Sequence, residues 1–309
     1  MALYGAQGFY RRESPAAHFR TSAHASPRFA AALVRMARQA GLDTVVDIGA
    51  GRGELLTQMH LLDPGLDLLG VEIAHRPAAL PAAVAWTAAL PESVEGLVVA
   101  NEWLDDSPCH VVEVDDDGAA RVVHVDPATG RESLGAPVAD RSVPASLRDW
   151  LARWWPLEPV PGLRAEVGTT RDAAWADVVR RVRAGMAVAI DYGHVRGSRP
   201  PLGTLRSYRH GREVDVLPDG SRDVTAHVAV DAVAAAVGGA VRRQRDVLRE
   251  LGVDGRRPEP AAATRAPAAY LTALAAAGEG AELTAEGGLG DFSWVVSHVQ
   301  NGRGPAPGP

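Results

Sequence analysis

Short apolar runs alternate along the chain with stretches in which apolar residues recur every three or four positions. The longer spacing is typical of amphipathic helices, whereas short apolar runs bounded by turn residues are typical of buried parallel strands. We therefore expect helices at about 26–40 and 54–62, and strands at 44–48, 66–73, 84–86 and 97–100. The succession of strand, turn and helix predicts a doubly wound, mostly parallel α/β sheet.

The pattern changes after residue 108. Residues 110–114 and 121–125 alternate in polarity on either side of an Asp-Asp-Asp-Gly turn, which predicts a β-hairpin. A helix is expected at 143–157, where a stripe of tryptophan and leucine is more typical of packing than of a ligand site. Further helices are expected at 173–183 and 228–237, and further strands at 186–190, 241–245 and 292–299.

These elements predict four parts of the chain. We expect a helical cap or lid at 1–40, a Rossmann-like core at 41–108 and 166–300, an inserted hairpin and helical subdomain at 109–165, and a disordered Gly/Pro-rich tail at 301–309. The sheet of the core is expected to be mostly parallel, with an antiparallel edge strand.

Composition narrows the class of protein. The chain is 46% apolar and carries a net charge of −6, which favours a globular protein over a general nucleic-acid binder. Its single cysteine excludes an internal disulfide framework, and the histidines lack metal-binding spacing. No signal peptide or membrane span is evident, so we expect a cytoplasmic protein, with the composition of a GC-rich bacterial genome. A homodimer is left open.

The most informative stretch is the loop that follows the first predicted strand. Asp47 precedes Gly49, Ala50, Gly51 and Gly53, and a helix begins directly afterwards. Glycines at alternate positions let a ligand lie against the backbone. The spacing departs from the dinucleotide fingerprint, and an acidic residue here disfavours a pyrophosphate. An acidic residue here instead suits the positively charged ammonium group of S-adenosylmethionine (SAM). After methyl transfer the cofactor product is S-adenosylhomocysteine (SAH).

The next two strands end in further candidate cofactor contacts. Glu72, followed by Ile73, comes 25 residues after Asp47, where a carboxylate accepts both hydroxyl groups of a ribose. Thr87 and Ala88 follow the third strand, where the adenine edge is expected.

Candidate catalytic residues follow the fourth predicted strand. In open α/β sheets, ligands bind beyond the carboxyl ends of the strands, so Asn101, Glu102 and Asp105 should face the sulfonium methyl group. The amide oxygen of Asn101 could orient an acceptor nitrogen, and the two acids could hold a cation or accept its proton. The alternative is a solvated acidic loop anchored in the core by Trp103 and Leu104.

Several blocks resemble the MidA-like class I methyltransferases, a family whose mitochondrial members methylate an arginine of a respiratory complex I subunit. The resemblance runs from about residue 8 to 230. Its blocks are Ala17–Ser26, Asp47–Gly53, Asn101–Pro108, Ile190–Gly193, Gly203–Arg206 and Asp223–Val228. It implies a SAM-binding fold and cofactor contacts from Thr21, Ser22 and Asn101. Asp223, Thr225 and His227 form a candidate polar site with His227 as a candidate general base, although Asp-x-Thr before a helix is also an N-terminal cap pattern.

The departures from the family pattern weaken the expectation of an arginine acceptor. Two acidic positions of the opening block are His18 and His24 here, and a guanidinium calls for acidic partners. The principal hypothesis is methyl transfer from SAM to nitrogen, or less strongly to oxygen, of a protein or small molecule, including a secondary metabolite. The alternatives are a SAM-binding assembly factor with little turnover and, more distantly, a nicotinamide-dependent oxidoreductase. No metal is expected.

Overall fold

The computed structural model describes residues 2–5, 8–12, 22 and 26–300. Its centre is a seven-stranded sheet with the order β15-β16-β9-β4-β1-β2-β3. The strands are β1 (Thr44–Ile48), β2 (Asp67–Val71), β3 (Ala85–Thr87), β4 (Val94–Asn101), β9 (Val182–Asp191), β15 (Ala240–Arg243) and β16 (Ser293–Val299). β1, β2, β3, β4 and β9 pair in parallel, and β16 is antiparallel to both neighbours. The predicted doubly wound sheet is confirmed, with β15 lying outside the antiparallel strand.

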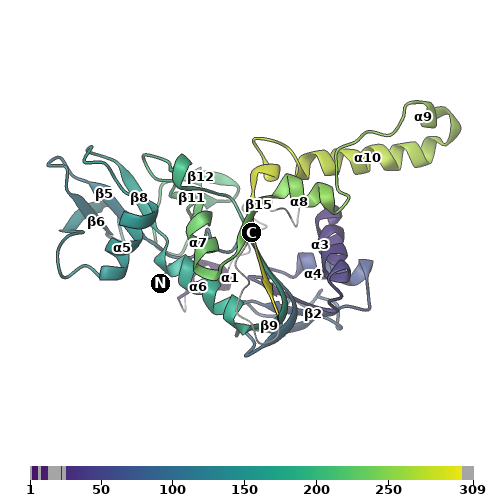
Figure 1. Cartoon of the computed structure of the whole chain (residues 1–309), viewed down its shortest axis with the longest axis horizontal. Coiled ribbons are helices and arrows are strands. Elements are labelled where there is room, and N and C mark those ends of the chain that lie inside the picture. Colours follow the sequence, from purple (N-terminus) through teal and green to yellow (C-terminus); the bar gives the residue numbers. More distant parts are fainter. Residues whose placement is uncertain (1, 6–7, 13–21, 23–25, 301–309) are drawn as a thin grey trace.

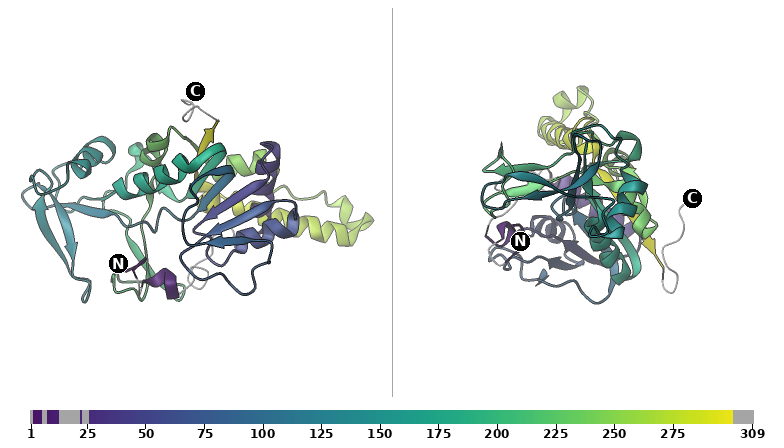
Figure 2. Two further views of the ribbon diagram at one scale, coloured as in Figure 1. Left: turned by 90° about the horizontal axis from the view of Figure 1, so that it is seen from below. Right: turned by 90° about the vertical axis from the view of Figure 1, so that its left-hand side faces the viewer.

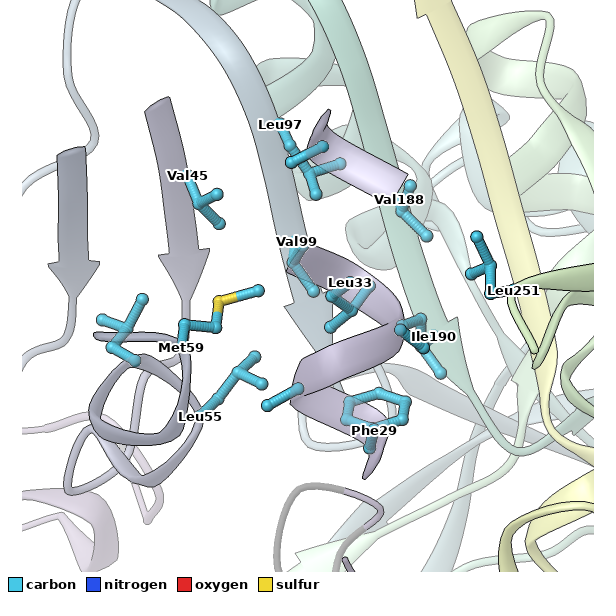
Figure 3. Close-up of a cluster of buried hydrophobic side chains, with 14 of the residues drawn as sticks. Phe29, Leu33, Val45, Leu55, Met59, Leu97, Val99, Val188, Ile190 and Leu251 are labelled. Carbon is cyan, nitrogen blue, oxygen red and sulfur yellow. The ribbon is translucent and has the colours of Figure 1, made fainter. Parts of the chain in front are cut away.

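Helices cover both faces of this sheet. Neighbouring strand residues point to opposite faces, so Val45 packs into one buried cluster and Val46 into another. On the first face lie α3 (Pro27–Gln39), α4 (Glu54–Leu62) and α8 (Gln244–Glu250); Figure 3 shows Phe29, Leu33 and Met59 against Val99 and Ile190. On the second face lie α6 (Thr169–Arg181) and α7 (Val230–Val237). Burial on both faces explains why the central strands read as continuous apolar runs.

A second sheet forms one end of the molecule (Figure 1). Its order is β7-β6-β5-β8, and α5 packs against it around a separate buried cluster that includes Trp150 and Trp155. The elements are β5 (His110–Val114), β6 (Ala120–Val125), β7 (Glu132–Pro137), α5 (Ala145–Trp154) and β8 (Arg164–Val167). The predicted hairpin is present as the antiparallel pair β5 and β6.

Smaller elements lie between β9 and α7 and near the chain start. They are α1 (Phe9–Arg12), β10 (Gly193–His194), the short helix η2 (Arg196–Ser198), β11 (Arg206–Arg209), β12 (Arg212–Val214), β13 (Asp223–Thr225) and β14 (Val228–Ala229). The helix expected at 228–237 begins only at Val230, because residues 228 and 229 pair with β10. α1 lies beside this region (Figures 1 and 2), and Phe9 and Tyr10 bury against Val224.

α9 (Ala261–Arg265) and α10 (Pro267–Leu283) form an arm at the opposite end (Figure 1). The short η3 (Leu289–Asp291) follows them and contacts α8. The left view of Figure 2 shows the second sheet and this arm on either side of the central sheet. Among the described residues, no helix combines the length and apolar character that a membrane crossing needs.

Candidate functional site

A cavity of about 250 Å³ opens where β1, β2 and β4 end. The glycine loop, the residues after β2 and β3, and the residues after β4 form its walls, together with two tyrosines from the start of the chain. Its lining residues are Tyr4, Tyr10, Ile48, Gly49, Gly51, Val71, Glu72, Ile73, Ala88, Leu90, Glu102, Trp103 and Asp106. Its place at the carboxyl ends of parallel strands is where open α/β sheets bind ligands.

The loop glycines serve different purposes. Gly51 lines the cavity with φ +57°, and the nearest atom to an added Cβ would be a carboxylate oxygen of Glu54 at 3.4 Å. Gly53 has φ +75° and begins α4, but a Cβ there would lie 2.4 Å from Leu80. The structure therefore places Gly51 at the cavity and Gly53 in packing behind it, outside the cavity lining.

Glu72 is held against the glycine loop. Its carboxylate accepts hydrogen bonds from the backbone N–H groups of Gly51 (3.1 Å) and Ala74 (3.0 Å). Burial raises its pKa, and these hydrogen bonds oppose the rise. Ala88 lines the cavity nearby, whereas the Thr87 hydroxyl caps the turn by bonding the backbone of Ala89 and does not line it.

Asp47 lies beneath the loop and does not line the cavity. Its pKa is raised to about 8 by burial and by the carboxylates of Glu54 and Glu72. Ala50 is also buried outside the cavity lining. The predicted contact of Asp47 with the cofactor is therefore wrong for the cavity wall: its carboxyl group is buried behind the loop, outside the cavity lining.

The residues after β4 turn sharply at Glu102, which has φ +52°. Such a left-handed conformation is uncommon outside glycine and marks a position held by its surroundings. Its backbone N–H donates to the carbonyl of Ile190, and its carboxylate accepts from the backbone N–H of Ser22 (2.8 Å) and the amide of Asn101. Burial raises the pKa of Glu102 to about 8. Thr21, the other predicted contact of this segment, lies outside the described residues.

Next to Glu102 lies a group of buried carboxyl groups, which we call the acidic cluster: Asp105, Asp106, Asp191 and Asp223. The Asp105 carboxylate accepts hydrogen bonds from the hydroxyl groups of Tyr192 and Thr225, and that of Asp223 accepts one from Tyr10. Burial is the largest cause of a raised pKa for each of the four, and the pKa of Asp223 reaches about 7.

The acidic cluster has unused acceptors. Asp191 is satisfied by the backbone N–H groups of Leu104, Asp105 and Tyr192. Three other oxygens of the cluster and one of the neighbouring Asn101 are buried without a hydrogen-bond partner among the described residues: Oδ1 of Asp105, Oδ1 of Asp106, Oδ2 of Asp223 and Oδ1 of Asn101. Buried polar atoms without partners are costly, and a ligand that donates hydrogen bonds would satisfy them.

The structure brings together some predicted residues and separates others. Gly49, Gly51, Glu72, Ile73, Ala88 and Glu102 line one cavity. His227, predicted as a candidate base, does not line it: its ring packs edge-on against Tyr192 with centroids 5.1 Å apart, and burial lowers its pKa. Asp106, Tyr4 and Tyr10 were not among the predicted site residues. Among the described residues, no group of three His, Cys, Asp or Glu side chains could hold a metal ion.

The sheet order, the glycine loop and the acid at the end of β2 together define a class I SAM-dependent methyltransferase. The chain matches the family model Methyltransf_28, "Putative S-adenosyl-L-methionine-dependent methyltransferase", over residues 57–247, more than half of its length. It belongs to this family, which agrees with the resemblance found in the sequence. A search of curated proteins finds no match.

Two solved structures from Burkholderia thailandensis are similar over the whole fold. One is a COG1565 superfamily member bound to S-adenosyl-homocysteine, with 25% identity, a TM-score of 0.74 and coverage of 99% of this chain and 89% of the other. The second is an uncharacterized COG1565 superfamily protein with 26% identity, a TM-score of 0.74 and coverage of 99% and 88%. SAM is accordingly the cofactor of this chain. The loop fits it, because Gly51 leaves room at the wall and carboxylates surround the cavity.

Binding of SAM should release protons at pH 7. Asp47 and Glu102 have pKa values raised to about 8, so both are largely protonated in the free protein, and a positively charged ligand favours their ionised forms. Affinity should therefore rise with pH and level off above about 8. Each group can lose at most one proton, so each can increase the SAM association constant by at most about tenfold per pH unit. Calorimetry in buffers of different ionisation enthalpy measures the protons released.

Two comparisons isolate the cause of this release. SAH lacks the sulfonium charge, so its binding should release fewer protons than that of SAM. Asp47→Asn removes one titrating group and should flatten the pH dependence of SAM binding. Equal proton release for SAM and SAH in the wild-type protein would contradict this electrostatic account.

Proposed function

We propose that this methyltransferase modifies a positively charged nitrogen, and that its preferred acceptor is the guanidinium group of an arginine in a protein. The observation that carries the proposal is the acidic cluster. The cofactor cavity extends from the glycine loop to Asp106 and Tyr10. Asp106 lines it, Asp105 and Asp223 are buried outside its lining, and each of the three has an oxygen with no hydrogen-bond partner among the described residues. The acceptor would lie between this cluster and the sulfonium methyl group.

Charge distinguishes a cationic acceptor from a neutral one. Burial raises the pKa values of these carboxyl groups, and the charge of Asp105 raises those of Asp106 and Asp191 further. The group therefore cannot ionise fully without a compensating cation. A guanidinium supplies that charge and presents five N–H donors in a planar fork, matching several carboxylate oxygens at once. A hydroxyl acceptor would leave the cluster uncompensated. Nitrogen methylation is therefore favoured over oxygen methylation.

The transfer is a displacement at carbon. The acceptor nitrogen forms a bond to the methyl carbon as the bond from that carbon to sulfur breaks, and the electron pair of the broken bond stays on sulfur, giving neutral SAH. The methylated nitrogen gives up one N–H proton, for which the nearby carboxylates of Asp105 and Asp106 are the acceptors. The glycine loop would hold the cofactor and the acidic cluster would hold the acceptor. The resulting alignment of the reacting atoms would supply much of the rate enhancement.

The test is to incubate the protein with methyl-tritiated SAM and fractions of a bacterial lysate, and to hydrolyse the labelled protein to amino acids. The expected product is N-methylated arginine, with label lost when excess SAH is added. Label released by mild base would indicate a carboxyl ester instead. Absence of label in every fraction, with SAM still bound, would favour the alternative of an assembly factor with little turnover.

A further inference from the structure

Arg171, on α6, lies directly behind the acidic cluster. It is only 2% exposed, and among the described residues it is the one arginine that is wholly buried. Its guanidinium donates to three backbone carbonyl groups: those of Asp105 (2.7 Å), His227 (2.9 Å) and Ser107 (3.3 Å). It therefore bonds at the same time to the loop after β4 and to the loop between β13 and β14.

These two loops carry much of the candidate acceptor site. Asp105 and Asp106 come from the loop after β4, and Thr225, which donates to the Asp105 carboxylate, ends β13. The backbone N–H of Ala226 also donates to the carbonyl of Asp105 (3.2 Å). Three elements far apart in the sequence thus meet at the main chain of Asp105, and the guanidinium joins them.

Arg171 differs from the arginine of an ordinary buried ion pair because its guanidinium bonds to backbone carbonyl groups. The structure records no hydrogen bond or ion pair from its guanidinium to a carboxylate of the described residues, although Asp105 and Asp191 are near enough for its charge to lower their pKa values. Bonding to carbonyl groups uses its donors without occupying the carboxylate oxygens. Oδ1 of Asp105 therefore keeps no hydrogen-bond partner among the described residues, although it is buried outside the cavity lining.

We propose that Arg171 is a positioning residue for methyl transfer: its hydrogen bonds to the main chain fix the Asp105 carboxyl group behind Asp106, and its positive charge favours the ionised form of that group. The proposal rests on the function proposed above. Arg171 acts through Asp105 and not by touching the cofactor or acceptor, since it lines no part of the cavity.

Other groups also bear on the ionisation of Asp105. Burial raises its pKa, while the hydrogen bonds from Thr225 and Tyr192 and the charge of Arg171 lower it. Among the described residues, the titratable and charged groups around it are Tyr4, Tyr10, Glu102, Asp106, Arg171, Asp191, Tyr192, Asp223 and His227. Arg171 is the cation of this set, so its removal should change the titration of Asp105 in one direction, upward.

The experiment follows the carboxyl carbon of Asp105 by NMR in SAH-bound protein labelled with [4-13C]aspartate, with Asp105→Asn identifying the resonance. Arg171→Met and Arg171→Gln should each raise the titration midpoint of Asp105 by about one pH unit or more. SAH affinity should stay within about threefold of wild type. Arg199→Met is the matched control, because Arg199 is a largely buried arginine paired with Asp231, away from the cluster, and it should leave the midpoint unchanged.

Each outcome has a defined meaning. A folded Arg171 variant in which Asp105 titrates as in wild type would overturn the proposal, and loss of folding in both variants would assign Arg171 to stability alone. Once an acceptor has been identified, the pH–rate profile of the Arg171 variants can be measured. Its acidic limb should shift to higher pH by the same amount as the titration midpoint seen by NMR. Because the titration needs no acceptor, failure of the proposed function would appear separately, as the absence of methylation by wild-type protein.

Discussion

Gly51→Val should abolish cofactor binding while leaving the protein folded. Gly51 lines the cavity, and within the described part of the chain the one atom closer than 4 Å to an added Cβ is a carboxylate oxygen of Glu54, so the new side chain would project into the ligand's space. We expect SAH affinity to fall at least about 100-fold, equivalent to roughly 2.7 kcal/mol. Isothermal calorimetry measures the affinity, and circular dichroism checks the fold.

The control for backbone strain is Gly41→Val. Gly41 has φ +68°, close to the +57° of Gly51, and a Cβ there meets nothing within 4 Å. Both substitutions force a β-branched residue into the left-handed region and should cost about 1–2 kcal/mol of stability. Only Gly51→Val should lose the ligand. Equal SAH binding by the two variants would show that the loop does not form the cofactor wall.

Asp106→Asn should leave cofactor binding intact and remove most methyl transfer. Asp106 lines the cavity, is buried, and has one carboxylate oxygen without a partner. Asparagine has nearly the same shape but cannot offer a negative charge to a cationic acceptor. We expect kcat/KM to fall by about 100-fold or more, the scale of a lost charged hydrogen bond in a buried site, with SAH affinity changed less than about threefold.

Asp172→Asn provides the matched comparison. Asp172 is also largely buried with one oxygen unpartnered, but its other oxygen accepts from the indole N–H of Trp150, beside the second sheet and not at the cavity. Its substitution should leave kcat/KM nearly unchanged. Equal losses from the two substitutions would point to general destabilisation as the cause.

The sequence predicted the central sheet well because its strands are buried on both faces. Thr44–Ile48 and Glu54–Leu62 have the predicted bounds. α10 was missed because its alanine-rich sequence has no amphipathic period. β11 and β12 were missed because their arginine-containing segments lack an apolar face, and β13 because three residues are too short to show a period. The order of the strands in the sheet could not be predicted either, because the pattern of apolar residues does not determine which strands pair with each other.

The site was predictable where function depends on local sequence. The glycine loop, Glu72 and Glu102 follow strands directly, so their positions come from chain order alone. Tyr10 and Asp223, by contrast, meet across 213 positions, and only the folded chain brings them together. Arg171 gave no signal because a lone arginine in a helical pattern is usually a solvated surface residue.

The position of β16 has a consequence for biosynthesis. This strand is translated after every other strand of the central sheet, yet it lies between β9 and β15. Until residues 293–299 have left the ribosome, the long apolar β9 has one open edge, which can pair with other chains. A nascent chain must therefore keep this edge protected, and a premature stop shortly before residue 293 would yield an aggregation-prone product even though the cofactor loop had already been made.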